Sequence, residues 1–283
     1  MDGIYSNLLE LLKYLQNELD HIDQLIESGD PVRKELYRAS VLSTSDRFDQ
    51  ITNHNGKTDL VPARQKLFLY RGQHEDWENC NSALYRDHKP NDDSGFVSIL
   101  KTYELEIVLS KHPAVKDLVN TGYNINFEGL AQHYGLATNL IDFTSDHHVA
   151  AFFGCTNYES GKYFPVESDF GKTGYGELYK INTAALWEKH GGKFIPLFEP
   201  IGLQVFSRPE LQKAYGVKGV KKNSATKRYI FKHDFKASKK IFDLFEGGNS
   251  LFPPDPLAKK VKEIKDSNTF SLNSIILLKD RRP

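Results

Sequence analysis

The sequence is poor in cysteine and carries no excess of either charge. Its 283 residues include two cysteines, Cys80 and Cys155. Two cysteines are too few for a disulfide framework, and these two do not form the C-x-x-C pair of a zinc site. Lysine plus arginine and aspartate plus glutamate number 37 each, so the whole molecule sets up no field that attracts nucleic acid or an anionic membrane. Either partner would have to use a local patch.

Long apolar runs are also missing. No stretch approaches the roughly 20 apolar residues that a membrane-spanning helix requires, and we predict no contact with a membrane. The leucines of the first segment, Met1 to Asn17, are interrupted by charged residues, unlike the basic start and continuous apolar run of a signal peptide. The few cysteines fit a reducing compartment. We therefore expect a cytoplasmic protein.

Four familiar site motifs are absent: G-x-G-x-x-G, the P-loop, H-E-x-x-H and G-x-S-x-G. Their absence argues against the common dinucleotide, nucleotide, zinc-protease and serine-hydrolase sites. His147 and His148 are adjacent, so on a helix they would point about 100° apart and would not share a metal ion. We predict no metal site.

The sequence does contain enough apolar and aromatic residues, 39% and 12%, to form a large core. From Ser6 to Glu27 the leucines and isoleucines recur three or four residues apart, which predicts an amphipathic helix with Ser6 as its N-cap. The segment from Gly29 to Pro62 is polar and rich in turn residues. We therefore expect two parts: residues 1–62, a helical appendage with a polar connector that packs on the domain or binds a partner, and residues 63–283, the main domain.

Within the main domain, short β-like segments alternate with helical ones. The predicted strands are Lys66–Tyr70, Thr138–Phe143, Gly176–Ile181, Lys193–Phe198, Arg228–His233 and Ser274–Lys279. The predicted helices are Gly95–Ser110, Asn126–Tyr134, His147–Gly154, Pro209–Tyr215, Ala237–Glu246 and Pro256–Asp266. This order indicates an α+β fold with a mixed β-sheet core flanked by helices.

Three polar segments stand out from this apolar background, and we expect them to meet in one cleft. They are Arg71-Gly72-Gln73, Gln132-His133-Tyr134-Gly135, and the group Thr138, Asp142, Thr144 and Ser145. A guanidinium is a planar fork of donors suited to phosphate or carboxylate. The alternative is a structural network, in which Asp142 braces a backbone amide or Arg71, because buried polar groups must find partners.

The same segments resemble the FRG domain family, named for its Phe-Arg-Gly motif, here Tyr70-Arg71-Gly72. The run from Gln132 to Ser145 is similar to the family's H-Y-G-x-P-T-R-L-L-D-W-T segment, although Ala137, Asn139 and Phe143 replace the usual proline, arginine and tryptophan. The resemblance extends over roughly residues 67–264, and its late part includes Arg208 to Ala214 and Leu251 to Ala258.

The order of these motifs is in turn similar to that of arginine-class ADP-ribosyltransferases, which use NAD as a substrate. The resemblance implies that Arg71 holds the NAD phosphates and that Thr144 or Ser145 orients the nicotinamide ribose. It also implies a late carboxylate that stabilises the oxocarbenium ion: Glu210 by position, with Glu199 and Glu246 as alternatives. Gln212 could take the same place and hydrogen-bond the ribose, but it could not supply a charge. Further ligand-binding residues would be Gln73, His133, Tyr134, Thr138, Asp142, Arg208 and Gln212.

Two functions remain open, together with a weaker third. The first is an ADP-ribosyltransferase-like toxin or phage-defence effector that modifies a nucleic acid or protein and has an antitoxin or partner protein at its N-terminal helix. The second is a noncatalytic module that binds a ligand or nucleic acid through the same cleft. A nuclease would need a cluster of metal-binding acids that the sequence lacks. A basic run could contact nucleic acid or form a solvated loop: Lys218, Lys221, Lys222, Lys227, Arg228 and Lys232.

Overall fold

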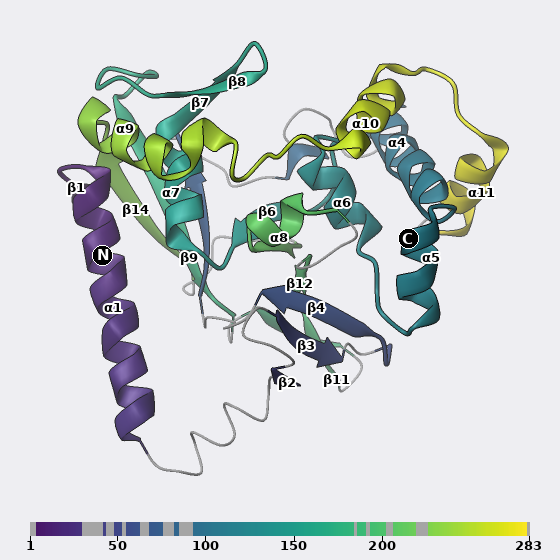
Figure 1. The fold of residues 1–283 in the computed structure, drawn as a ribbon, viewed down its shortest axis with the longest axis horizontal. Coiled ribbons are helices and arrows are strands. Elements are labelled where there is room, and N and C mark those ends of the chain that lie inside the picture. The colour runs from purple at the N-terminus through teal and green to yellow at the C-terminus, as the bar shows by residue number, and fades with distance from the viewer. Residues whose placement is uncertain are drawn as a thin grey trace.

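A mixed seven-stranded sheet forms the centre of the protein (Figure 1). The computed structural model describes residues 4–29, 42–43, 48–52, 55–62, 68–75, 82–84, 93–183, 186–190, 193–201, 206–218 and 226–281. Along the sheet the strands are β1 (Ile4–Tyr5), β14 (Thr226–Lys232), β9 (Tyr175–Asn182), β5 (Phe68–Gln73), β6 (Ile141–Thr144), β13 (Ala214–Val217) and β12 (Phe198–Pro200). Every neighbouring pair is antiparallel except β1 with β14. The predicted α+β class and mixed sheet are confirmed.

The smaller strands form ribbons outside this sheet. They are β2 (Leu42–Ser43), β3 (Phe48–Thr52) and β4 (Thr58–Pro62) in one sheet, the hairpin β7 (Thr156–Glu159) and β8 (Lys162–Pro165), and the pair β10 (Trp187–His190) and β11 (Lys193–Pro196).

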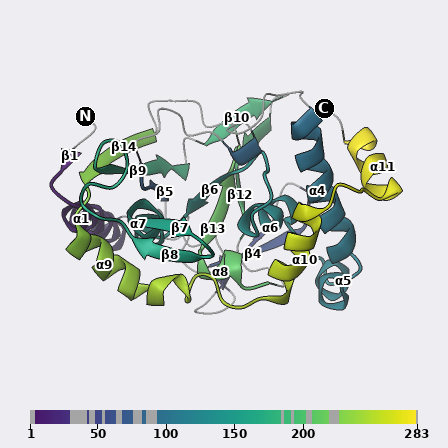
Figure 2. The same cartoon turned by 90° about the horizontal axis from the view of Figure 1, so that it is seen from above.

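The helices gather on one face and at one end of the sheet (Figures 1 and 2). They are α1 (Leu8–Ser28), α4 (Asp93–Leu109), α5 (Pro113–Asn120), α6 (Phe127–His133), α7 (His147–Cys155), α8 (Arg208–Leu211), α9 (Phe235–Leu244), the 3-10 helix η2 (Glu246–Gly248), α10 (Pro256–Asp266) and α11 (Leu272–Asp280). Both views place α1 and α11 at opposite ends of the molecule.

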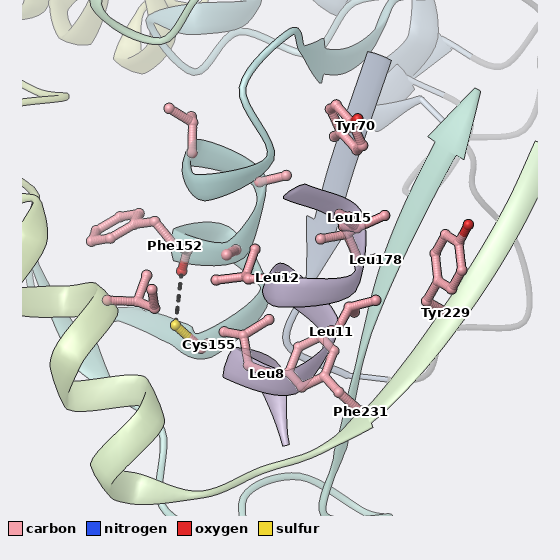
Figure 3. Close-up of a cluster of buried hydrophobic side chains, with 14 of the residues drawn as sticks. Leu8, Leu11, Leu12, Leu15, Tyr70, Phe152, Cys155, Leu178, Tyr229 and Phe231 are labelled. Atoms are coloured by element: carbon pink, nitrogen blue, oxygen red, sulfur yellow. Dashed lines mark hydrogen bonds between the residues drawn. The ribbon is translucent and has the colours of Figure 1, made fainter. Parts of the chain in front are cut away.

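The N-terminal helix packs into the main core, which is one of the two alternatives expected for this segment. Its leucines at 8, 11, 12 and 15 are at most 5% exposed and pack against α7, β14 and β9 (Figure 3). Strand β1, just before the helix, also extends the sheet by pairing with β14. The apolar stripe of the helix was predicted correctly, but the spacing of leucines does not show which other elements the stripe packs against. The division between residues 62 and 63 remains a prediction.

Several predicted boundaries need correction. The N-cap of α1 is Asn7, whose Oδ1 accepts a hydrogen bond from the Glu10 amide at 3.1 Å, while Ser6 hydrogen-bonds the Glu10 carboxylate. Strand β5 does not end at Tyr70 but continues through Gln73, because all six of its residues pair with β9.

Two predicted elements are of the wrong type. The segment Ser274–Lys279 is helical, as part of α11, because Ser271 caps the helix by accepting from the Ser274 amide at 3.3 Å. The predicted helix Pro209–Tyr215 is the four-residue α8 followed by strand β13, whose ladders with β6 and β12 override the local helix preference. Among the described residues, no helix is long and apolar enough to cross a bilayer.

Candidate functional site

The candidate site is a hollow in the middle of the sheet, where β5 and β6 separate. The two strands are in register at one residue pair, Tyr70 with Thr144. Beyond that pair β5 continues along β9, while β6 continues along β13. The gap between them opens into a hollow of about 200 Å³. Its lining is Tyr70, Arg71, Gly72, Gln73, His74, His133, Asp142, Phe143, Thr144, Val149, Ala150, Phe153 and Gln212.

Gly72 lets helix α7 approach the strand that carries Arg71. A Cβ atom at this position would lie 1.8 Å from the Ala150 carbonyl oxygen and 2.7 Å from the Gly154 nitrogen. A glycine allows a ligand or another backbone to approach closely, because it has no Cβ atom. The backbone of α7 fills that role, so this glycine serves the packing behind the hollow.

Arg71 lies half-buried in the hollow and spans the gap between the two strands. Its Nη1 donates to the Asp142 carbonyl oxygen at 2.9 Å, and its Nε donates to Gln73 Oε1 at 3.3 Å. These bonds use two of the five guanidinium N–H groups. No carboxylate of the described residues lies within 4.0 Å of the guanidinium. The structural network that the sequence left open is present in part, because Arg71 binds the Asp142 carbonyl, but among the described residues it includes no ion pair of Arg71.

Gln73 adds a second donor, and the orientation of its amide is fixed. Since Arg71 Nε can only donate, the Gln73 atom facing it must be the oxygen. The side chain is 3% exposed, and its Nε2 has no hydrogen-bond partner among the described residues. A buried donor without a partner costs free energy, and a ligand acceptor would remove this cost.

Asp142 is held by a chain of hydrogen bonds behind the hollow. Gln132 Nε2 donates to Asp142 Oδ2 at 2.9 Å, and Thr138 Oγ1 donates to Gln132 Oε1 at 2.5 Å. Thr138 is 3% exposed and also accepts from the Leu140 amide at 3.2 Å. Thr138 and Gln132 therefore orient Asp142 and do not line the hollow themselves.

His133 faces the other oxygen of Asp142. Gln212 Nε2 donates to the Leu251 carbonyl at 3.1 Å, so Gln212 Oε1 is the atom 2.7 Å from His133 Nδ1. An amide oxygen only accepts, hence Nδ1 of His133 carries the proton. Its Nε2 lies 3.8 Å from Asp142 Oδ1, beyond hydrogen-bond distance, and neither atom has a hydrogen-bond partner among the described residues.

The two predicted hydroxyls differ in position. Thr144 lines the hollow, is 5% exposed, and its Oγ1 accepts from the Asp146 amide at 3.0 Å. Ser145 does not line it, and its amide donates to the Lys213 carbonyl at 3.1 Å. The predicted meeting of Arg71 with both hydroxyls therefore holds for Thr144 alone.

Asp146 is the N-cap of α7. Its Oδ1 accepts from the His148 amide at 2.8 Å, and its other oxygen pairs with Lys213. Burial alone would raise the pKa of this carboxyl, but the bonds from His148 and Lys213 lower it below the usual value. Asp146, His147 and His148 place one potential metal ligand each within 4.8 Å of one another. Capping and pairing already explain the acid, so we assign no metal here.

The late predicted residues lie away from the hollow, apart from Gln212. Glu210 is on α8 and does not line it. Arg208 lies in a neighbouring groove with its guanidinium 4.5 Å from the centre of the Tyr134 ring. The Tyr134 hydroxyl donates to Asp255, the N-cap of α10. Burial, and next the bond to Asp255, raise the pKa of this phenol.

The structure describes both alternatives for the catalytic acid and part of the basic run. Glu199 pairs with Lys218 at 2.7 Å, outside the hollow. Glu246 lines the neighbouring groove. Arg228, on β14, pairs with the buried Glu177. Lys221 and Lys222 of the basic run lie outside the described residues. So do Trp77, Tyr85 and Arg86, which follow the Arg71-Gly72-Gln73 segment in the stretch that resembles the FRG family.

Sequence reasoning missed part of the lining. His74, Val149, Ala150 and Phe153 border the hollow, and burial lowers the pKa of His74. His74 directly follows the Arg-Gly-Gln segment, which was the one local signal. The three residues of α7 read as ordinary core, and only the close approach at Gly72 brings them to the site.

The fold and the hollow define an α+β protein with a polar site at the seam of its sheet. A protein-family model of the FRG domain matches residues 66–162, so the chain contains an FRG domain over that range. The matched range includes β5, α6, β6 and α7, which carry most of the lining. No curated protein and no solved structure matched the chain.

Proposed function

We propose that the FRG domain binds NAD and transfers its ADP-ribose to a macromolecule, as the motif order of ADP-ribosyltransferases suggests. The observation that supports this most directly is Arg71, which has no carboxylate partner among the described residues and lies in a hollow beside Asp142 and His133. An arginine with unused N–H groups suits a phosphate, because charge-assisted bonds of the guanidinium fork are strong and directional.

The carboxylate of Asp142 takes the role that position had suggested for Glu210. Breaking the bond between nicotinamide and ribose develops positive charge on the ribose, and a fixed carboxylate stabilises that charge in the transition state. Asp142 lines the hollow with Arg71, and Gln132 fixes the carboxylate by donating to its Oδ2. Gln73 Nε2 donates to an acceptor of the same ligand.

The biological role that goes with this activity is a toxin or phage-defence effector of the cytoplasm. It rests on the resemblance of FRG-like domains to toxin components. An antitoxin or partner protein at α1 would have to use the helix's exposed side, because the leucine stripe is buried in the core.

The proposal is tested by measuring nicotinamide release and NAD binding on the same preparations. We expect Arg71→Ala to weaken NAD binding about 10- to 100-fold, since hydrogen bonds to charged groups contribute about 1.5–3 kcal/mol. Arg71→Lys, which keeps the charge and loses the fork, falls between, and Lys13→Ala on the exposed side of α1 serves as the surface control. Asp142→Asn should retain binding and lose turnover. No NAD binding by calorimetry to folded wild-type protein would refute the proposal.

A second function is a noncatalytic module that binds the same ligand. It is favoured by Glu210, which lies outside the hollow and leaves no second carboxylate in its described lining. Calorimetry and mass spectrometry separate the two functions: NAD binding that Arg71→Ala abolishes, with neither nicotinamide nor labelled macromolecule formed in lysate, supports the module.

A further inference from the structure

A second, larger depression adjoins the hollow. This aromatic groove encloses about 1070 Å³ and shares His133, Asp142, Phe153 and Gln212 with the hollow. It runs between the β7–β8 hairpin, α8, α9 and η2, and in Figure 1 the hairpin and α9 lie at the same end of the sheet. A molecule lying in the groove therefore reaches the edge of the hollow.

Aromatic rings line the groove, and two of them are open to solvent. Tyr158 and Phe164, on the two strands of the hairpin, are 60% and 48% exposed. The ring centre of Tyr163 lies 4.8 Å from that of Tyr158. Tyr163 also stacks on Phe252, with ring centres 4.9 Å apart and ring planes 25° apart. Tyr158 pairs with Tyr163 across the hairpin and shares its face, whereas Phe164 pairs with Asn157 and lies on the opposite face. The exposed Tyr158 ring beside the partly buried rings of Tyr163 and Phe252 forms a surface that a planar base can cover with little loss of side-chain entropy.

The groove also contains cations that no acid of the described chain neutralises. The side chain of Arg208 makes no ion pair there, lies over the Tyr134 ring, and has a buried Nε without a hydrogen-bond partner. Lys162 and Lys265 also line the groove. Of the lining acids, Asp243 is paired with Lys239. Asp142 and Glu246 are the other two acids of the lining, so three cations stand against two carboxylates that no lysine or arginine of the described residues pairs with.

We propose that the aromatic groove binds a single strand of nucleic acid, the acceptor for the proposed ADP-ribosyl transfer. Base stacking on Tyr158 with phosphates at Arg208 and Lys162 is the combination by which proteins hold single strands. A duplex hides the faces of its bases within the stack and has no use for the exposed rings. A protein acceptor would require neither the open rings nor the unpaired cations together.

This inference rests on the proposed function only for the transfer step. In that step an O–H or N–H group of the strand forms the new bond to C1 of the nicotinamide ribose. The bond from C1 to nicotinamide breaks, with its electron pair leaving on the nicotinamide nitrogen, and the proton of the acceptor passes to water.

Binding of the strand is tested without NAD. Fluorescence anisotropy with a labelled 12-nucleotide DNA strand, its RNA equivalent and the matching DNA duplex measures affinity between 50 and 200 mM salt. We expect the single strands to bind at least tenfold more tightly than the duplex. Tyr158→Ala should weaken binding about tenfold, whereas Phe164→Ala, on the opposite face of the hairpin, should weaken it much less. Arg208→Ala should lower the slope of log K against log salt by about 0.7 for each phosphate that the variant no longer neutralises.

Two matched variants control for folding and for general surface effects. Phe235→Ala removes an aromatic ring that is 38% exposed but does not line the groove, and Lys13→Ala removes an exposed cation on α1; both should bind as the wild type does. Tyr158 and Phe164 are exposed enough that their loss leaves thermal unfolding almost unchanged.

Some outcomes overturn the inference while leaving the proposed function intact. They are no binding of either strand, equal affinity for the duplex, an equal weakening in Phe235→Ala, or labelling of protein alone by an active enzyme. Conversely, strand binding that weakens as expected in the groove variants, but without NAD binding, supports the groove and refutes the transferase.

Discussion

Replacing Leu11 by alanine tests whether the N-terminal helix belongs to the core. Leu11 is 0% exposed and contributes to the cluster that joins α1 to α7 and β14. Removing a buried leucine side chain costs about 2–5 kcal/mol, depending on how far the surroundings collapse into the cavity. We expect about 3 kcal/mol here, because buried side chains of α7, β9 and β14 surround Leu11. This loss is a large share of the roughly 5–15 kcal/mol by which domains are stable.

Urea unfolding followed by circular dichroism measures this change as a lower midpoint at an unchanged slope. Lys13→Ala, on the exposed side of the same helix, controls for helix propensity and should shift the free energy of unfolding by less than about 0.5 kcal/mol. A loss below about 1 kcal/mol in Leu11→Ala would contradict the reasoning and restore the helix to the peripheral position that the sequence suggested.

Three further changes test other parts of the structure. Gly72→Ala places a methyl group 1.8 Å from the Ala150 carbonyl, so we expect a loss of about 3 kcal/mol or more in thermal unfolding; a stable variant would refute the close approach. Asp146→Ala removes the cap of α7 and should cost about 1 kcal/mol at pH 7. The folded pKa of Asp146 is lowered, so the stabilisation by its carboxylate is present above the pKa of the unfolded chain and is lost as the pH falls below about 4. As the pH falls through this range, the urea midpoints of variant and wild type should converge. Glu18→Gln leaves buried Lys180, 2.6 Å away, without its charged partner and should cost about 1–3 kcal/mol at pH 7, less than for a fully buried pair. Burial lowers the folded pKa of Lys180, although Glu18 opposes this. The unfolded chain therefore binds more protons than the folded one, and the free energy of unfolding rises with pH toward about 10.4. For the same reason the cost of Glu18→Gln should shrink at about pH 9.5.

The sequence indicated where the site would be because its polar residues interrupt apolar segments. Arg71, Gln73, His133, Asp142 and Thr144 all line the hollow as that pattern predicted. The local signals for α6 were sufficient too: Asn126 caps the helix and a glycine with positive φ follows it. These features depend on residues close together in the chain.

Features that depend on distant residues were not predictable in the same way. The segment at Ala214–Val217 becomes a strand because β6 and β12 offer it partners, and Ser274–Lys279 becomes helical through a capping serine outside the apolar run. Glu210 was selected by its position in a motif, but the end of α8 places it outside the hollow. A single sequence carries no signal for which distant strands will pair.

Strands β5 and β6 share a single register pair, so the sheet has fewer backbone connections there than between β5 and β9 or between β6 and β13. Four strands on one side and three on the other are joined there through Tyr70 and Thr144, and next to that pair a side chain, Arg71, completes the connection by binding the Asp142 carbonyl. The Arg71 guanidinium thus links the two parts of the sheet and also lines the hollow. A ligand that took over the Arg71 hydrogen bond would leave the Tyr70–Thr144 pair as the backbone pairing between β5 and β6.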